Sequence, residues 1–379
     1  METVSNYTEE FKFLKSCFSN WKDVPEKKIS FQRLNSLSNV IYKVTADTEV
    51  IPKSIILRKF GKNDTVVDKD KEAKVFDLFA ETGLGPKCYA KNSEYRCEEY
   101  LESDLIKNSQ INEPYWRRKL AIVIAKHHAM SVPGVKRSNV MLERIKDTNL
   151  LEVINEKCAL DGFSSEQIKM LDEMKLFGSK EEQELAKTIV PTENLVFSHN
   201  DIHAGNILIT KPERKVFLID YEFCDYNNRA FDGACLFVTS MLDFEFPSPP
   251  YFSIDPKIFP KFEDITDFAM YYLCASRLTN KEIEELEKDE ARLNDNSWLH
   301  EKIKSELNGD GFETELKTYL EEFQKCCLLC HYDAILWGIL MCEPKKESFC
   351  FDYLQYAYDR SKYYLRWRER FFKGGSIFE

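Results

Sequence analysis

The order of apolar and polar residues predicts a sheet-rich first part of the chain. Residues 68–82 are a predicted helix, because Ala73, Phe76 and Phe79 recur at spacings of three and form one apolar stripe. Three segments rich in β-branched and aromatic residues are predicted strands: 29–34, 40–44 and 54–58. Two short strands are predicted after the helix, near 88–90 and 96–101.

From Glu113 onward the pattern changes to long helices, of which the clearest is predicted over Trp116–Met130. The apolar run Ala334–Cys342 is a predicted buried helix. Because strands and helices are segregated along the chain, we expect an α+β fold with two lobes. The N-terminal lobe, 1–101, is small and sheet-rich, and the C-terminal lobe, 102–379, is larger and helical. Strands return only briefly in the second lobe: 195–197, 207–209 and 216–219.

Composition narrows the classes of partner. The 379 residues are 43% hydrophobic, which is enough to build the cores of a two-lobed enzyme. The formal net charge of -11 argues against nucleic acid as a partner, because binding to phosphate backbones relies on Lys and Arg. No apolar run approaches the roughly 18 residues of a transmembrane helix, so we expect no membrane insertion. The first residues lack the apolar core of a secretory signal, and we expect a cytoplasmic protein.

Twelve cysteines are spread through apolar segments, which is typical of reduced thiols in a protein core. Cys326, Cys327 and Cys330 are followed by His331, but no second pair of ligands lies at zinc-finger spacing. We therefore interpret this cluster as buried helix residues.

The segment Ser198–Leu208 carries the most specific chemical signal. His199 is followed by Asp201, Asn206 lies five residues further on, and Asp220 closes the hydrophobic strand that comes next. This order of an aspartate, an asparagine and a second aspartate is typical of kinases. Asp201 is the expected catalytic base that accepts the proton of a substrate hydroxyl. Asn206 and Asp220 supply the hard oxygen ligands that Mg²⁺ prefers. Each residue alone would be an ordinary turn or cap, and the spacing carries the prediction.

The surrounding residues give the chain a resemblance to the choline/ethanolamine kinase family. Ser198–Asn206 is followed by Ile219–Phe223 and then by Tyr226–Asp232, and Leu336–Gly338 resembles the distal substrate segment of the family. The similarity runs in the family's order from about residue 35 to residue 364. It implies a protein-kinase-like fold, ATP and Mg²⁺ as cofactors, a small amino-alcohol as substrate, and a role in phospholipid synthesis. Family members are often dimers, so a homodimer is one expected assembly.

The resemblance also implies a set of nucleotide-binding residues. Arg58 ends an apolar strand and Glu72 lies on the next predicted helix, as in kinases that hold nucleotide phosphates with a strand cation and a helix carboxylate. The alternative is a surface ion pair. His203 stands where the family usually carries Gln. A phosphate loop is implied at Asn35, Ser36, Leu37, Ser38 and Asn39, and an adenine-binding segment at Glu99, Tyr100 and Leu101. The family's glycines are absent from the phosphate loop.

A substrate pocket is implied by the same resemblance, at Glu222, Phe223, Phe244, Trp337, Phe351 and Tyr356. Aromatic faces and negative charge suit an ammonium group. The chain departs from the family pattern here: Leu340 replaces a common Trp, and Cys235, Leu236 and Thr239 stand where an Asn-His pair and a Glu are usual. A primary ammonium needs acceptors and a trimethylammonium needs rings, so the choice between ethanolamine and choline stays open.

Two alternatives to this prediction come from different classes. The first is a kinase of the same fold that acts on another cationic substrate, such as an aminoglycoside-like sugar. It shares the two aspartates but is not expected to carry Tyr226–Asp232. The second is a non-catalytic, pseudokinase-like binding protein, which the altered loop at Asn35 and Ser36 would suit. The intact Asp201, Asn206 and Asp220 argue against it.

Overall fold

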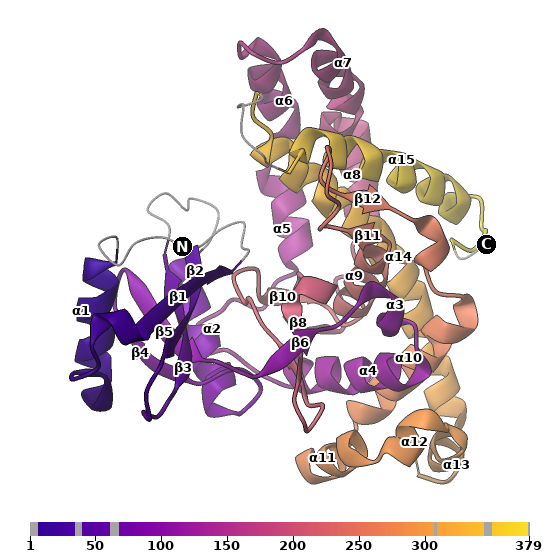
Figure 1. The fold of residues 1–379 in the computed structure, drawn as a ribbon. Helices are drawn as coiled ribbons and strands as arrows, with labels where there is room; N and C mark the ends of the chain where they lie inside the picture. The colour runs from indigo at the N-terminus through magenta and orange to yellow at the C-terminus, as the bar shows by residue number, and fades with distance from the viewer. Residues whose placement is uncertain (1–6, 35–39, 61–67, 307–308, 345–350, 378–379) are drawn as a thin grey trace. The chain divides into compact units, whose positions relative to one another are not determined.

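The computed structural model describes residues 7–34, 40–60, 68–306, 309–344 and 351–377, which form two compact units (Figure 1). The N-terminal unit comprises Met1–Asp104 together with Leu208–Phe223. The helical unit comprises Leu105–Ile207 and Cys224–Glu379. The N-terminal unit is therefore discontinuous in sequence, because a β-hairpin from the middle of the chain returns to it.

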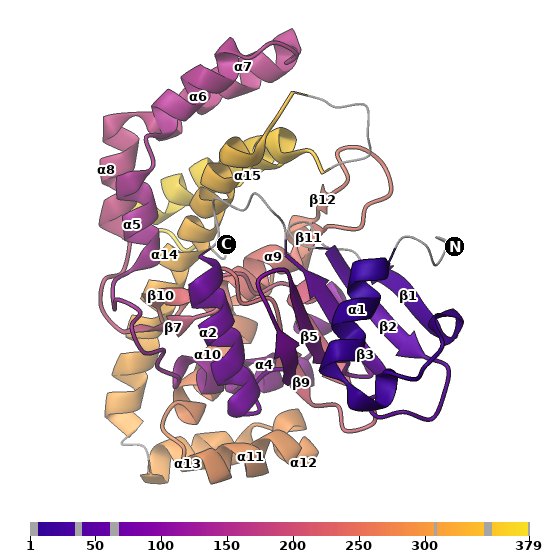
Figure 2. The ribbon, with the colours of Figure 1, turned by 90° about the vertical axis from the view of Figure 1, so that its left-hand side faces the viewer.

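A five-stranded antiparallel sheet forms the N-terminal unit, with the strand order β1-β2-β3-β5-β4. Helix α1 (Thr8–Cys17) lies over this sheet (Figure 2). Its buried Phe11 and Leu14 share a core with Val44, Ile55 and Cys97 of the sheet. The strands are β1 (Ile29–Leu34), β2 (Val40–Ala46), β3 (Ser54–Lys59), β4 (Cys88–Lys91) and β5 (Tyr95–Glu99).

Helix α2 (Lys69–Glu81) begins where the side chain of Asp68 accepts a hydrogen bond from the backbone N–H of Lys71. Its buried residues Val75, Phe76 and Phe79 form the apolar stripe expected from the sequence. A three-stranded sheet with the order β6-β8-β9 completes this part of the fold. Its strands are β6 (Ser103–Leu105), β8 (Ile207–Thr210) and β9 (Val216–Leu218).

The helical unit is built around α14 (Gly309–Met341), a helix of 33 residues that packs against α9, α10 and α15. Short antiparallel pairs connect the helices: β7 (Leu195–Ser198) with β10 (Asp225–Asn228), and β11 (Leu242–Asp243) with β12 (Ser253–Ile254). The other helices are α3 (Asn108–Ile111), α4 (Pro114–His128), α5 (Val140–Asp147), α6 (Leu150–Ala159), α7 (Ser165–Met174), α8 (Lys180–Ile189), α9 (Phe231–Ser240), α10 (Phe262–Ala275), α11 (Asn280–Lys288), α12 (Glu290–Asn294), α13 (Ser297–Glu306) and α15 (Tyr353–Phe372).

Several sequence expectations are met in detail, and others are corrected. The cysteine cluster lies buried in α14, as expected. The last predicted strand ends at Glu99 rather than at Leu101. Helix α1 and strand β10 were not predicted. Both are short, and β10 is a polar tetrapeptide that is a strand only because it pairs with β7. Within the described residues, no helix is long and apolar enough to span a membrane.

The crossing of α14 and α15 depends on Gly338. A Cβ atom at this position would lie 2.7 Å from the carbonyl oxygen of Tyr353 and 2.8 Å from the Cβ of Ala357. Both distances are shorter than real contacts of a Cβ, and the first obstacle is backbone, which cannot rotate away. The glycine therefore sets how closely α15 approaches α14, next to Trp337.

We expect Gly338→Ala to destabilise the protein by about 1–2 kcal/mol, measured by urea unfolding. Overpacking costs about 1–3 kcal/mol, which outweighs the roughly 1 kcal/mol that alanine gains over glycine in a helix. Leu340→Ala on the same helix removes an exposed side chain and should change stability by about 0.5 kcal/mol or less. Equal stability of Gly338→Ala and the wild type would contradict this account of the crossing.

Candidate active site

The loop that carries the predicted catalytic residues is held by one buried carboxylate. Asp232, in the first turn of α9, accepts the backbone N–H groups of His199 and Asn200 at 2.7 and 2.8 Å. It also accepts a hydrogen bond from Nε2 of His128, on α4, at 2.9 Å. Burial would raise the pKa of Asp232, but the bond from His128 and the nearby His199 hold this pKa below its ordinary value. The ionised carboxylate thus fixes the backbone just before Asp201.

Asn200 gives the loop its turn. Its φ of 65° is left-handed, a conformation that Asn tolerates better than most residues. The side-chain amide donates to the carbonyl of Asp225 at 3.1 Å and accepts from Nδ2 of Asn227 at 2.8 Å. Asn139 in turn donates to Asn227 at 3.1 Å. These bonds tie the loop to β10 and hold an unusual backbone conformation in place.

Asp201 and Asn206 are brought together by the loop. The amide nitrogen of Asn206 donates to the backbone carbonyl of Asp201 at 3.0 Å and to its carboxylate at 3.1 Å. Because the nitrogen points to Asp201, the Oδ1 atom of Asn206 points the other way. The side chain of Asp201 is 36% exposed, so it is accessible to a ligand. Nε2 of His203 lies 3.8 Å from the same carboxylate.

A buried charge network organises the N-terminal unit around Arg58. Nε of Arg58 donates to Glu98 at 2.9 Å, and Nη1 donates to Asp220 at 3.3 Å. Glu72 binds Arg96 through two hydrogen bonds of 2.7 and 2.8 Å, and Arg96 also binds Glu98. Burial lowers the pKa of Arg58, but Glu98 and Asp220 raise it above its ordinary value. The direct partners of Arg58 are therefore Glu98 and Asp220 rather than Glu72, and the sequence did not reveal the roles of Arg96 and Glu98 in this network.

Asp220 follows β9 with a φ of 71°, which is left-handed and strained for an aspartate. The next residue, Tyr221, anchors the turn: its hydroxyl donates to the carbonyl of Leu218 at 2.6 Å, and its ring lies 4.7 Å from that of Phe79. Gly85 leaves room for this hydroxyl, since a Cβ there would lie 2.5 Å from it. The buried tyrosine thus holds the carboxylate of Asp220 against Arg58.

The remaining nucleotide residues are placed as follows. Glu99 accepts the backbone N–H of Lys87 at 3.2 Å, and Nζ of Lys43 lies 4.0 Å from the centre of the Tyr100 ring. Leu101 lies between β5 and β6, in a segment without regular secondary structure. The predicted phosphate loop, Asn35–Asn39, lies outside the described residues.

Four of the six predicted substrate residues belong to the helical unit and form an aromatic group. The ring of Phe351 lies 5.3 Å from Tyr356 and 6.1 Å from Phe244, which is 5.5 Å from His203. Trp337 and Phe351 both pack against an apolar cluster that contains Tyr356. The other two residues, Glu222 and Phe223, belong to the N-terminal unit.

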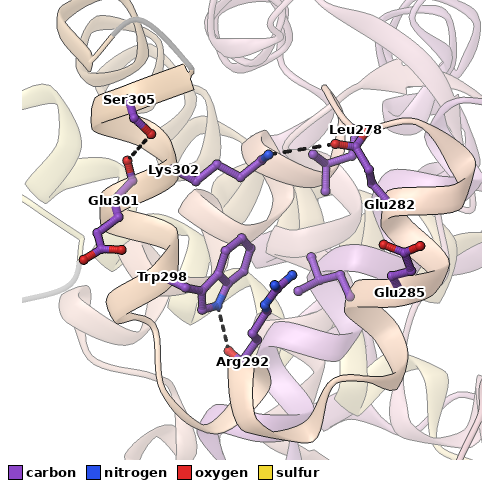
Figure 3. Close-up of a pocket in the computed structure, with 9 residues that line it drawn as sticks. Leu278, Glu282, Glu285, Arg292, Trp298, Glu301, Lys302 and Ser305 are labelled. Carbon is purple, nitrogen blue, oxygen red and sulfur yellow. Dashed lines mark hydrogen bonds and ion pairs between the residues drawn. The ribbon is translucent and has the colours of Figure 1, made fainter.

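A cavity of about 350 Å³ lies elsewhere in the helical unit, between α11, α12 and α13 (Figure 3). Its wall combines carboxylates and cations with Trp298, whose indole nitrogen donates to the carbonyl of Arg292 at 3.0 Å. None of the predicted site residues within the described part of the chain lines it. The sequence-predicted chemistry is therefore not at this cavity.

The architecture is that of protein-kinase-like phosphotransferases with two lobes. A choline kinase from Cryptosporidium parvum superimposes with a TM-score of 0.71 at 20% identity and covers 97% of each chain. An ethanolamine kinase from Plasmodium vivax gives a TM-score of 0.69 at 16% identity, over 97% of this chain and 92% of that chain. The expected fold class is confirmed.

Sequence comparison then gives the family. Residues 31–365 match the pattern of the choline/ethanolamine kinase family. A Homo sapiens choline/ethanolamine kinase is 26% identical over 358 residues, which are 91% of this chain and 82% of the relative. A probable ethanolamine kinase of Arabidopsis thaliana is 24% identical over 284 residues, covering 72% of this chain and 70% of the relative. The chain belongs to the choline/ethanolamine kinase family, and the expectation of a kinase is confirmed.

We expect Asp232→Asn to lower the free energy of unfolding by about 3 kcal/mol or more, because it removes a buried charge that three donors share. The exposed Asp172→Asn, which loses only a pair with Lys175 one turn away, should stay within about 0.5 kcal/mol of the wild type.

The effect of Asp232→Asn on the free energy of unfolding should depend on pH. The pKa of Asp232 is depressed in the folded state, so its stabilisation is complete above the unfolded pKa of about 4 and is lost as pH falls through the folded value. The stability difference between wild type and Asp232→Asn should stay constant between pH 5 and 7, roughly, and shrink below about pH 4. A difference that is independent of pH down to about 3 would show that Asp232 does not act as an ionised acceptor.

Proposed function

We propose that this protein transfers the terminal phosphoryl group of ATP to the hydroxyl group of choline or ethanolamine. The observation that carries the proposal is the pairing of an accessible Asp201 with Asn206 on a loop fixed by Asp232. Membership of the choline/ethanolamine kinase family supports the substrate class.

Asp201 is the proposed base. Its carboxylate is oriented by the amide of Asn206 and remains open to solvent, so a substrate hydroxyl can reach it. A hydroxyl hydrogen-bonded to this carboxylate is oriented for attack and loses its proton to it as the new O–P bond forms.

The residues fit a magnesium ion. The amide oxygen Oδ1 of Asn206 is turned away from Asp201. Asp220 offers a partly exposed carboxylate as a second oxygen ligand. Both are hard oxygen donors of the kind Mg²⁺ prefers. When bound, the ion neutralises negative charge on the phosphate groups of the nucleotide. Asn206 and Asp220 are the residues that would hold it.

Arg58 is the proposed phosphate ligand in the N-terminal lobe, 1–101, which we propose as the nucleotide-binding domain. Glu98 and Asp220 hold its guanidinium in one orientation, which lowers the entropy cost of binding a phosphate oxygen. Glu72 contributes indirectly, through Arg96 and Glu98. Asn35–Asn39, Glu99–Leu101 and His203 complete the proposed nucleotide set, as the family resemblance implies.

The aromatic group of Phe244, Trp337, Phe351 and Tyr356 is the proposed site for the ammonium head, together with Glu222 and Phe223. Ring faces attract a cation that has lost its water, and this attraction does not require N–H donors. We further propose that the phosphorylated product serves phospholipid synthesis in the cytoplasm and that the protein is a homodimer, as members of the family often are.

The test is phosphoryl transfer from Mg-ATP to choline and to ethanolamine, measured side by side. Turnover should require Mg²⁺ and stop on addition of a chelator. Asp201→Ala should lower kcat by roughly 10²–10⁴-fold, the usual contribution of a general base, while Asp172→Ala leaves it unchanged. Absence of turnover on both amino-alcohols, with ATP still bound, would refute the proposal and favour a binding protein or another cationic substrate.

A further inference from the structure

Asp333 is a carboxylate that the sequence argument did not single out. It lies on α14 one helical turn before Trp337, so the two side chains project from the same face of the helix. Ala334, beside it, packs in the cluster that contains Tyr356. The side chain of Asp333 is 22% exposed, which leaves its oxygens partly accessible.

Arg144 of α5 holds this carboxylate from one side. A single nitrogen, Nη1, lies 2.8 Å from one oxygen of Asp333 and 3.0 Å from the other. A carboxylate has about four acceptor positions, so this contact leaves others for a ligand. Burial lowers the pKa of Arg144, whereas Asp333, Asp225 and Asp201 raise it. The guanidinium therefore lies in the field of three carboxylates.

The charges of Asp333 and of the proposed catalytic base, Asp201, both act on Tyr356. Burial raises the pKa of Tyr356, Arg360 lowers it, and Cys235, Asp201 and Asp333 raise it, with a net value of about 12. Both carboxylates thus raise the pKa of one residue of the aromatic group Phe244, Trp337, Phe351 and Tyr356, which we call the cage. Arg360 is itself buried behind the cage, where it donates to Tyr356 at 2.7 Å.

We propose that Asp333 binds the ammonium head of the substrate and biases the site toward a primary ammonium, as in ethanolamine. The inference rests on the proposed function. A primary ammonium has three N–H donors and gains a charge-assisted hydrogen bond from a carboxylate, whereas a trimethylammonium has none and gains only the weaker field. Asp333 thereby supplies an acceptor at the cage, where the chain lacks the acidic residue usual after Asp232.

The decisive variant is the double substitution Asp333→Asn with Arg144→Gln. It removes one charge of each sign, so the net charge of the site is unchanged and neither partner is left unpaired. Affinities for ethanolamine and choline are measured by isothermal titration calorimetry, and kcat and KM are measured with each. The double variant should bind ethanolamine about tenfold or more weakly, the value of a charged hydrogen bond, and choline within about threefold of the wild type.

The single substitutions provide a readout that a structural ion pair would not give. Each breaks the same pair, but Asp333→Asn leaves a cation at the site and should raise KM for both substrates. Arg144→Gln leaves an anion and should lower KM for both. Asp172→Asn is the control and should change neither value. Thermal unfolding checks that each variant is folded.

The outcomes separate this inference from the proposed function. Equal losses for ethanolamine and choline in the double variant, no loss for ethanolamine, or single variants that shift KM in the same direction would each overturn the role of Asp333. Wild-type protein that binds both amines without turnover would refute the kinase proposal, while the affinities still decide the role of Asp333. Wild-type protein that binds neither amine would overturn both.

Discussion

The buried carboxylate of Asp232 is the constraint on which the candidate catalytic loop depends. Two consecutive backbone N–H groups, from His199 and Asn200, converge on it, and His128 supplies a third donor. Burying a single ionised carboxylate is costly unless donors surround it. Here two of the three donors come from the loop itself, so the bonds that satisfy the charge also fix the loop. Because Asp201 directly follows His199 and Asn200, these bonds also fix the position of its backbone.

The N-terminal unit also buries charged side chains, and it stabilises them in a network of alternating positive and negative charges. Arg58 and Arg96 share Glu98, and each has a further carboxylate of its own, Asp220 and Glu72. Every charge in this network has an opposite neighbour, so none of them is left unpaired when water is excluded. The network joins two strands, a helix and the turn after β9, which are distant in sequence, and it holds Arg58 beside Asp220.

The residues that we propose for substrate specificity lie largely on α14 and α15. Gly338 lets the two helices approach closely enough for the rings of Trp337, Tyr356 and Phe351 to lie in one region. On the same face of α14, one turn before Trp337, Asp333 carries a negative charge that the aromatic residues lack. Rings and carboxylates attract ammonium ions by different means, so in this proposal their balance sets which substituents on nitrogen are tolerated.

The sequence by itself determined the fold class and the residues at which chemistry is expected. Long periodic segments such as 68–82 identify their own structure, and Asp201, Asn206 and Asp220 are identifiable because their chemistry requires a fixed spacing within one stretch of chain. Only the tertiary structure decided that Glu98 is the partner of Arg58, that β10 is a strand, and that Asp232 and Asp333 lie beside the loop and the cage. These contacts are between residues far apart in sequence, and no local sequence pattern predicts which buried charges will pair when the chain folds.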